Sequence, residues 1–450
     1  MKRIQLRLAD QLLPFQARIA YVMDCFCNHP LAAKQLSYQI NGPADSQAIN
    51  ILYAPEKPAA LTAFFIPAQG IAFAKHPPRF SDLKANGFDH ADLTLYSVAY
   101  QKQANQAFCS NGIFAFDWLE TLFFHLSRYE EYHCRSHQMD PWDMMKKEEQ
   151  FLYKHHLHLQ PIVDHLVFAC LSVLGLTPKR IATTYCMTHD IDAVWKFPSL
   201  WKYIRAAGRQ YFKDRQISSQ FTLLKTYWQT RQGQQKDPYD TFDWLLRKEP
   251  RFEKIIYWLA GGITRYDHFF DIRHPYVASL LRLARQRGYQ IGLHPSYAAY
   301  QREDLLLKEK TDLEAVAQQR IFHNRQHFLH VDWPLTWSLL EAAGITEDSS
   351  LGYQDTLGFR CGTGFPYPLY HFEKEAPFDF VERPLVIMDT AVLMNCHDQA
   401  DQAIAQIKQL LNKNPSLTHI TFNFHNSTFD PLRLDAAVFK DFYEELCHWL

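Results

Sequence analysis

The chain has 450 residues, which exceeds the roughly 250–300 residues over which a single hydrophobic core usually grows, so we expect two domains. It contains 47 basic and 48 acidic residues, and 47% of its residues are hydrophobic. This balance excludes a disordered chain and provides no global field that would attract nucleic acid or an anionic membrane.

Three features of the sequence favour a cytoplasmic protein. The start, MKRIQLRLADQLLPF, lacks the apolar core and the cleavage site of a signal peptide. The most apolar stretch, 162–176, is interrupted by Asp164 and His165 and is shorter than the roughly 20 residues that span a bilayer. Nine cysteines without zinc-ribbon spacing fit reduced thiols better than disulfides, and we expect Cys25 and Cys27 to pack in the core.

Residues 1–180 predict an N-terminal α/β domain, whose role the sequence does not reveal. Short apolar runs predict strands at 48–54, 60–68 and 92–100. Apolar residues at three- and four-residue spacing predict a helix over 116–132, and a second helix near 161–174 would close the domain.

Two polar segments of this half receive no catalytic role. In the segment 127–131, SRYEE, we expect ion pairing. His155, His156 and His158 have no carboxylate or cysteine partners nearby in the sequence, so a solvated or half-buried stretch is the better interpretation.

Residues 181–450 predict a parallel α/β barrel, because short apolar strands alternate with helical stretches. The predicted strands are 182–190, 254–260, 289–296, 325–331, 344–350, 383–392 and 419–427. The span 196–250 is basic, aromatic and helical in pattern, and we expect a helical insertion that forms a wall or lid over the site.

Chemically capable residues follow most of these predicted strands. Asp190 and Asp192 are two residues apart, so one can bind a metal while the other accepts a proton from water. His294, in GLHPSY, could complete a metal site with an imidazole nitrogen. Arg360, in GFRCGT, is suited to hold an anionic or hydroxyl-rich group, and His425 lies at the mouth of the final strand.

Over about residues 181–430, these motifs resemble the NodB-homology polysaccharide deacetylases, which hydrolyse N- or O-acetyl groups on sugars. The resemblance implies a distorted seven-stranded barrel preceded by a smaller α/β domain. It also implies these roles: Asp190 as catalytic base, Asp192 and His294 as metal ligands, Arg325 as the residue that orients the base, Asp348 as the fourth-motif acid and His425 as general acid.

The sequence departs from the family pattern at two positions. Ala298 stands where the second motif usually carries another histidine, and His327 stands where the third motif usually has proline. His327 is therefore either a replacement metal ligand or an ordinary core histidine. Long bacterial deacetylase-like proteins with THDIDA, RYEE and GFRCGT segments resemble the chain over most of its length.

These observations predict a hydrolase of carbon–nitrogen bonds that uses a divalent metal, most simply zinc, to remove an acyl group from a carbohydrate or glycoconjugate. Asp192, His294 and His327 would hold the ion, and Arg360, Tyr297 and Ser296 would bind substrate. Two alternatives remain open: a metal-independent amide hydrolase on the same fold, and a catalytically silent carbohydrate-binding protein. The sequence identifies neither the sugar, the acyl group nor the oligomeric state.

Overall fold

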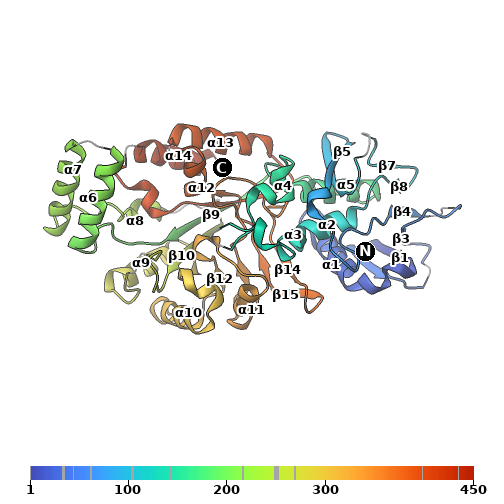
Figure 1. Cartoon of the computed structure of the whole chain (residues 1–450), viewed down its shortest axis with the longest axis horizontal. Coiled ribbons are helices and arrows are strands. Elements are labelled where there is room, and N and C mark those ends of the chain that lie inside the picture. Colours follow the sequence, from blue (N-terminus) through green and yellow to red (C-terminus); the bar gives the residue numbers. More distant parts are fainter. Residues whose placement is uncertain are drawn as a thin grey trace.

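The computed structural model of the chain describes residues 2–32, 36–43, 45–60, 63–102, 106–140, 143–214, 217–247, 253–267, 270–397, 399–433 and 435–449. Figure 1 shows an elongated molecule with an N-terminal sheet at one end, a larger sheet in the middle and a helical hairpin at the other end. The cysteines are all free thiols. Within the described residues, no helix combines the length and the apolar character that crossing a membrane requires.

The N-terminal half contains a six-stranded sheet and a separate hairpin. In spatial order, the sheet strands are β2 (Leu36–Ile40), β1 (Lys2–Leu8), β3 (Ile49–Ala54), β4 (Phe64–Pro67), β8 (Ile113–Phe114) and β7 (Cys109–Ser110). The hairpin consists of β5 (Lys84–His90) and β6 (Leu93–Ala99). The helices are α1 (Gln16–Asn28), α2 (Trp118–Leu126), α3 (Tyr129–Tyr132), α4 (Phe151–Lys154) and α5 (Ile162–Val173).

The predicted helix over 116–132 is interrupted at one residue. Arg128 has a φ of 54°, in the left-handed region, so α2 ends before it and α3 starts after it. Asp117 caps α2, because its side chain accepts a hydrogen bond from the backbone N–H of Glu120. After the break, Glu131 of α3 lies against Arg360 of the C-terminal half, whereas Glu130 accepts from the Phe151 backbone N–H.

The second half is built on a nine-stranded sheet. In spatial order, its strands are β14 (Tyr367–His371), β15 (Ala376–Glu382), β13 (Glu347–Asp348), β12 (His323–Asn324), β11 (Gln290–His294), β10 (Glu253–Leu259), β9 (Thr184–Ile191), β17 (His419–Asn423) and β16 (Ile387–Met388). All neighbouring strands are parallel except β14 and β15, which form an antiparallel pair. Helices surround the sheet: α8 (Phe242–Leu245), α9 (Pro275–Gln286), α10 (Glu303–Ala317), α11 (Leu335–Ala342), α12 (Asp389–Asn395), α13 (Ala400–Lys413) and α14 (Ala436–Trp449).

This sheet differs from the expected seven-stranded barrel in three respects. Its order runs from β14 to β16, and these end strands do not pair within the described residues, so barrel closure is not confirmed. β14 and β15 are additional strands. The predicted strand 325–331 is wrong, because the strand there is β12 and residues His327–Leu329 form a 3-10 turn with Phe328 at a φ of 58°.

The expected helical insertion consists of α6 (Leu200–Asp214), α7 (Ile217–Arg231) and the short α8. Its role as a wall or lid is not supported, because none of the described residues of 196–250 lines the cavity described below. The reason is the packing of the hairpin: Leu223 and Tyr227 are buried beside Phe197, and α6 and α7 project from the end of the molecule.

Candidate active site

The candidate site lies where the carboxyl ends of the parallel strands meet. β9 is central in its sheet, between β10 and β17, and Asp190 lies near its end. His294 ends β11, Arg325 directly follows β12, and His425 lies two residues after β17. Ligand sites of parallel α/β sheets form at this edge, so strand order accounts for the convergence of residues that are distant in the sequence.

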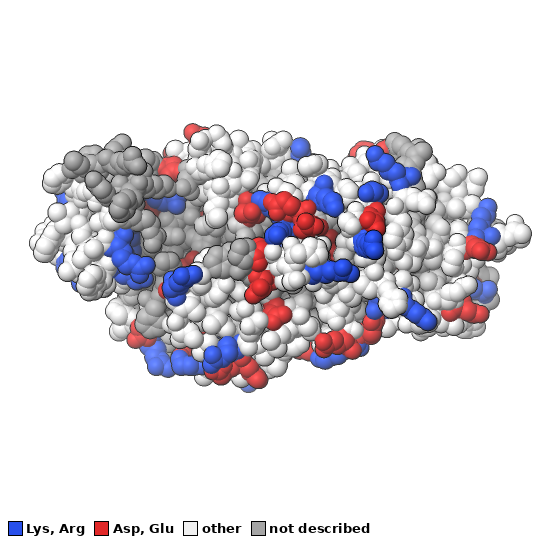
Figure 2. Space-filling view, viewed as in Figure 1, with Lys and Arg blue, Asp and Glu red and all other residues white. Residues whose placement is uncertain are grey.

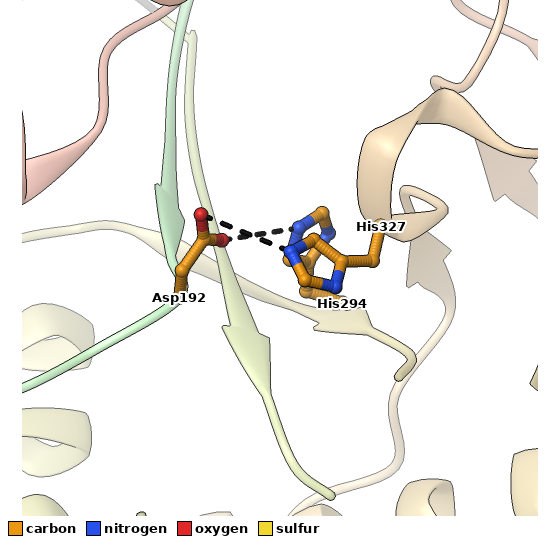
Figure 3. Close-up of side chains that lie close together, drawn as sticks. All are labelled: Asp192, His294 and His327. Carbon is orange, nitrogen blue, oxygen red and sulfur yellow. Dashed lines mark ion pairs between the residues drawn. The ribbon is translucent and has the colours of Figure 1, made fainter. Parts of the chain in front are cut away.

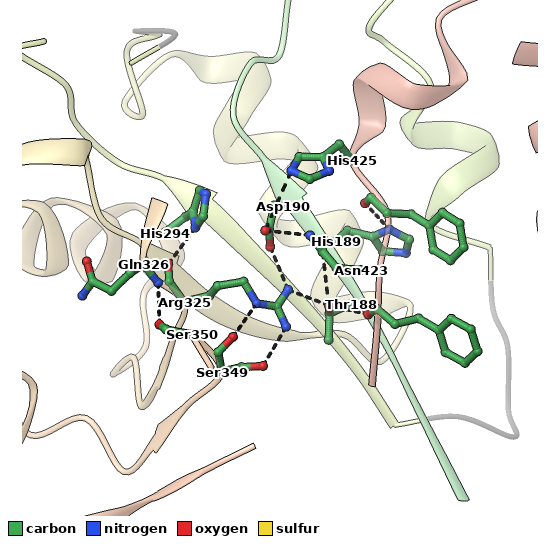
Figure 4. Close-up of polar contacts among 12 residues, drawn as sticks. Thr188, His189, Asp190, His294, Arg325, Gln326, Ser349, Ser350, Asn423 and His425 are labelled. Atoms are coloured by element: carbon green, nitrogen blue, oxygen red, sulfur yellow. Dashed lines mark hydrogen bonds and ion pairs between the residues drawn. The ribbon is translucent and has the colours of Figure 1, made fainter. Parts of the chain in front are cut away.

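Asp190 is a buried carboxylate held from two sides (Figure 4). Its Oδ1 accepts a hydrogen bond from Nη1 of Arg325 at 3.0 Å, and its Oδ2 accepts one from Nδ2 of Asn423 at 2.8 Å. Burial raises the pKa of this carboxyl, but the positive charges of Arg325, His294 and His425 together outweigh burial and leave the pKa below its usual value. Asp190 is therefore ionised at neutral pH and fixed in orientation.

Arg325 is itself fully buried and fully engaged. Its guanidinium donates to Thr188 Oγ1 at 2.7 Å, to Ser349 Oγ at 2.8 Å and to the Ser349 carbonyl at 3.0 Å. It also lies over the ring of Tyr257, with 4.4 Å between its Cζ and the ring centroid. These contacts leave it no freedom to follow a substrate, so it acts as a positioning residue for Asp190.

His425 faces Asp190 from the carboxyl end of the neighbouring parallel strand β17. Its Nδ1 lies 2.7 Å from Oδ1 of Asp389, whose Oδ2 accepts from the His425 backbone N–H at 2.8 Å and from the Thr428 hydroxyl. Its Nε2 lies 4.0 Å from Asp190 Oδ2 and 3.8 Å from Asp192 Oδ2. Burial lowers the pKa of His425, but the carboxylates of Asp389, Asp192 and Asp190 outweigh it and raise the pKa to about 10.

Asp192, His294 and His327 form a group of potential metal ligands (Figure 3). Asp192 Oδ1 lies 3.3 Å from His294 Nε2, and Asp192 Oδ2 lies 3.9 Å from His327 Nε2. One ligand atom from each of the three residues can be chosen so that all lie within 4.8 Å of one another. The carboxylate is partly exposed to the cavity, whereas both imidazoles are buried.

The hydrogen bonds behind the two imidazoles fit a cation at this position. His294 Nδ1 lies 2.7 Å from the Arg325 carbonyl, and His327 Nδ1 lies 3.3 Å from Asp267 Oδ1. A neutral imidazole that donates through Nδ1 keeps its lone pair on Nε2, and here both Nε2 atoms face the carboxylate of Asp192. Opposed lone pairs repel unless a positive charge lies between them, so the donor set suits a divalent metal.

His327 reaches the site by a route that the sequence pattern did not predict. The predicted strand 325–331 would place His327 on the same face as Arg325, but His327 lies at the start of the turn His327–Leu329. In that turn, Phe328 and Leu329 have positive φ values of 58° and 54°. The turn, rather than strand alternation, directs His327 toward Asp192.

These side chains open into a cavity of about 610 Å³. Asp190, Asp192, His294, His327 and His425 line its base. The aromatic residues of its wall are Tyr266, Tyr297, Phe328 and Tyr353, and a further wall comes from the N-terminal half through Met144, Met145, Lys147 and Gln150. Both halves of the chain therefore shape the space next to the reactive groups.

The four remaining predicted residues have different positions. Tyr297 and Arg360 line the cavity, although Arg360 is bound through its Nε and Nη2 to Glu131 at 3.0 Å each. Ser296 is buried outside the cavity lining, with its hydroxyl donating to Glu309 at 2.5 Å. Asp348 is also buried and does not line the cavity. Its carboxylate accepts hydrogen bonds from Asn324 at 2.6 Å and from Ser350, which hold it away from the cavity. Neither Ser296 nor Asp348 is placed to touch a substrate.

Two carboxylates of the site were missed in the sequence. Asp267 supports His327, and it also accepts from the Tyr297 backbone N–H at 2.8 Å. Asp389 supports His425. Asp389 directly follows the apolar strand β16, the same signal that identified Asp190 and His425, whereas Asp267 lies eight residues after the end of β10 and has no such signal.

Comparisons with known proteins give one partial family match and distant structural likenesses. A family of unknown function, DUF7033, matches residues 13–176. No curated protein matches the chain. Three solved structures resemble part of it. A polysaccharide deacetylase, described as putative, from Mycobacterium smegmatis has 17% identity and a TM-score of 0.34, with 59% of this chain and 84% of that chain covered.

A probable polysaccharide deacetylase from Pseudomonas aeruginosa PAO1 has 12% identity and a TM-score of 0.36, with 58% of this chain and 84% of that chain covered. The Puue allantoinase has 12% identity and a TM-score of 0.34, with 59% of this chain and 84% of that chain covered. Because each TM-score is below 0.5, we base the assignment of function on the geometry of the site.

Proposed function

We propose that the protein is a metal-dependent hydrolase that removes an acyl group, such as acetyl, from a carbohydrate or glycoconjugate. One observation carries the proposal: a potential three-ligand metal site lies beside a carboxylate held by an arginine and a histidine held by a second carboxylate. A binding protein needs no paired base and acid, whereas hydrolysis of an amide or ester needs both.

Asp192, His294 and His327 would hold the ion, and zinc suits a ligand set of one carboxylate and two imidazoles. A bound zinc ion polarises an acyl carbonyl and lowers the pKa of a bound water to roughly 7. Asp190, ionised and held by Arg325 and Asn423, would accept a proton from the attacking water. His425 carries a proton and, on the other side of the site, protonates the leaving amine or alkoxide.

The cavity supports a small substrate. Its volume of about 610 Å³ lies within the range of small-molecule sites, and it is bounded on one side by the N-terminal half of the chain. The rings of Tyr266, Tyr297 and Phe328 provide flat apolar surfaces against which the face of a sugar ring can pack. With the expected cytoplasmic location, these features favour a soluble sugar derivative or a glycoconjugate over a mature wall polymer.

The test combines metal analysis with turnover. Protein purified without chelator should contain about one zinc per chain and release acetate from a panel of acetylated sugars. Removal of the metal should abolish turnover, and zinc should restore it. Full activity in metal-free protein would support the metal-independent hydrolase instead. Sugar binding without turnover in zinc-loaded protein would support the silent binding protein.

A further inference from the structure

The helical hairpin α6–α7 has no role in the proposed reaction. It begins eight residues after Asp192 and lies at the end of the molecule opposite the N-terminal sheet (Figure 1). Its inner side is a small aromatic cluster in which Tyr203 of α6 stacks on Tyr227 of α7, with ring centroids 4.4 Å apart. Leu223 and Phe197 are buried in the same cluster, so the hairpin is packed together by these side chains.

The outer side of the hairpin is unusually apolar. Six large apolar side chains there are between 39% and 75% exposed: Leu200, Trp201, Ile204, Phe221, Leu224 and Trp228. The described part of the chain has fifteen exposed side chains of this kind, so a short segment holds six of them. Trp201 and Trp228, the two tryptophans that are exposed among the described residues, belong to this group. Leaving so much apolar surface exposed to water is unfavourable, which indicates a partner.

Helical geometry brings these six residues to one side. Successive residues of an α-helix are rotated by about 100° around its axis. The exposed residues of α6 are therefore rotated by about 60–160° around the helix axis from Tyr203, which faces α7. The exposed residues of α7 are rotated by about 100–160° in the same sense from the buried Leu223. The two helices are only two residues apart in sequence and lie side by side, so they run antiparallel. Equal rotations from facing sides of antiparallel helices point to the same side. The six residues therefore form one surface, the apolar face.

The sequence of the hairpin is also rich in positive charge. The segment 200–231 contains seven basic residues and one acidic residue, whereas the whole chain has a net charge of -1. The basic residues are Lys202, Arg205, Arg209, Lys213, Arg215, Lys225 and Arg231, and the acidic one is Asp214. Arg205, Lys225 and Arg231 are exposed, and Figure 2 shows basic side chains on the described surface near this end of the molecule.

The combination of charge and apolar surface distinguishes between partners. A second copy of the chain would bring two strongly basic hairpins together, and their charges would repel. Phosphates of nucleic acid would satisfy the basic residues but not the aliphatic side chains of Leu200, Ile204 and Leu224. An anionic lipid surface satisfies both, because apolar side chains enter the acyl boundary while Lys and Arg contact the headgroups.

We propose that α6 and α7 form a membrane-surface anchor, in which Trp201, Phe221 and Trp228 insert into a bilayer that contains anionic lipid. The helices lie on the bilayer and do not cross it, since no described helix is long and apolar enough to do so. The inference concerns a surface away from the cavity and does not depend on the proposed reaction.

The experiment is sedimentation of the full-length protein with vesicles. Vesicles of phosphatidylcholine mixed with phosphatidylglycerol should bind the protein, and vesicles of phosphatidylcholine alone should bind it much less. The variant with Trp201→Ala, Phe221→Ala and Trp228→Ala should bind the mixed vesicles at least about tenfold more weakly, because it loses the inserted rings. Two single charge variants are Lys202→Gln and Lys225→Gln. Each should weaken binding to the mixed vesicles by about fivefold, because it removes one positive charge near the headgroups.

The matched control removes three exposed apolar side chains elsewhere, with Leu307→Ala, Phe322→Ala and Leu335→Ala. These residues are between 40% and 43% exposed, so the control loses a similar kind of surface, and it should bind vesicles like the unmodified protein. Circular dichroism and melting temperature check that all variants fold. Failure to bind mixed vesicles, or equal binding by the triple aromatic variant, would overturn the proposal. A concentration-dependent dimer that the same variant abolishes would assign the apolar face to a second copy and would also overturn it.

Discussion

Asp190 lies on β9 and Asp192 directly follows the end of that strand, but their surroundings give them different chemistry. Asp190 is closed in by Arg325 and Asn423, whereas Asp192 faces the two imidazoles and the cavity. Both are carboxylates at the same strand end, so sequence spacing alone could not separate their roles.

We predict that Asp190→Asn lowers kcat by about 10²–10⁴-fold and leaves zinc content nearly unchanged, because the base is lost and the ligands remain. Asp192→Asn should lose zinc and activity together. Metal content by elemental analysis and turnover on the same preparations test this division. Asp401→Asn, at an exposed position of α13, is the control and should change neither quantity. Equal loss of zinc in both site variants would show that the roles are misassigned.

His327 decides whether the site has two or three protein ligands. His327→Ala removes one of the three potential ligands, so it should release zinc under mild chelation. Asp267→Asn leaves all three ligands but weakens the hydrogen bond that orients His327, and it should lower zinc affinity by about 10–100-fold. Zinc titration and melting temperature on each variant provide the test. A His327→Ala protein that is destabilised but keeps stoichiometric zinc would make His327 an ordinary core histidine.

The sequence was sufficient for residues that end strands and insufficient for the groups that support them. Asp190, His294 and His425 were found because each follows an apolar strand. Asp267 lies in a loop sixty residues before its partner His327, and only the folded path of the chain brings the two together. Ser296 and Asp348 share motifs with site residues, but neighbouring carboxylate and hydroxyl groups turn their side chains away from the cavity.

At the scale of elements, α3 connects the two halves through a buried charge cluster. Glu131 pairs with Arg128, and its two oxygens also accept from Arg360 at 3.0 Å each. Burial raises the pKa of Glu131, but the charges of both arginines outweigh it and lower the pKa to about 2. The expected ion pairing of the SRYEE segment is present, and it holds a residue of the cavity wall.

We predict that Glu131→Gln destabilises the protein by about 3–5 kcal/mol at pH 7, because buried Arg360 loses its carboxylate partner and buried Arg128 keeps Glu130 only at 3.8 Å. A carboxyl whose pKa falls on folding stabilises the native state above its unfolded pKa. That contribution is lost as the pH falls from about 4.5 toward 2, so the difference between the two proteins should shrink over this range. Urea unfolding of the unmodified protein and of the Glu131→Gln variant at several pH values measures this difference in the free energy of unfolding.

The control for this prediction is the exposed ion pair of Arg302 and Asp304. Its Arg302 Nη2 and Asp304 Oδ2 atoms are 2.6 Å apart. Asp304→Asn should leave the free energy of unfolding nearly unchanged, since exposed pairs are screened by solvent. If Glu131→Gln were no more destabilising than this control, the buried cluster would contribute no net stability.

The strand predictions were least accurate where strands are very short or where strands pair with partners that are distant in the sequence. β12 and β13 have two residues each, which is too short for a propensity pattern, and their pairing depends on neighbouring strands. β15 alternates buried and exposed residues over Ala376–Glu382 and could have been recognised from that pattern. The antiparallel hairpin that it forms with β14 extends the sheet beyond the expected seven strands.

At the scale of the whole molecule, net charge and chain length did not reveal the basic hairpin or the shared core. The net charge of -1 gave no indication of the basic hairpin, because acidic residues elsewhere balance it. Chain length predicted two domains with separate cores. The main apolar cluster instead runs from β1 and α1 into β11, β14 and β15, so the two sheets share one core.

The shared core makes the boundary near residue 180 a poor place to divide the protein. Tyr21 of α1 packs on Tyr370 of β14 with ring centroids 4.8 Å apart, and its hydroxyl donates to the Pro368 carbonyl at 2.9 Å. Asp164 of α5 accepts from the hydroxyl of Thr418 at 2.6 Å. Cutting the chain would expose these apolar surfaces and leave buried polar groups without partners.

We therefore predict that residues 181–450 expressed alone do not form a stable native state. The fragment should aggregate or bind a hydrophobic dye, because the surface of β14 and β15 that packs against α1 and α2 would face water. The full chain should unfold in a single calorimetric transition, as expected for one cooperative core. Two separate transitions in the full chain, together with a fragment that melts at the same temperature as one of them, would establish independent domains. Zinc-saturated protein should be used in both measurements, so that loss of the metal is not mistaken for loss of the shared core.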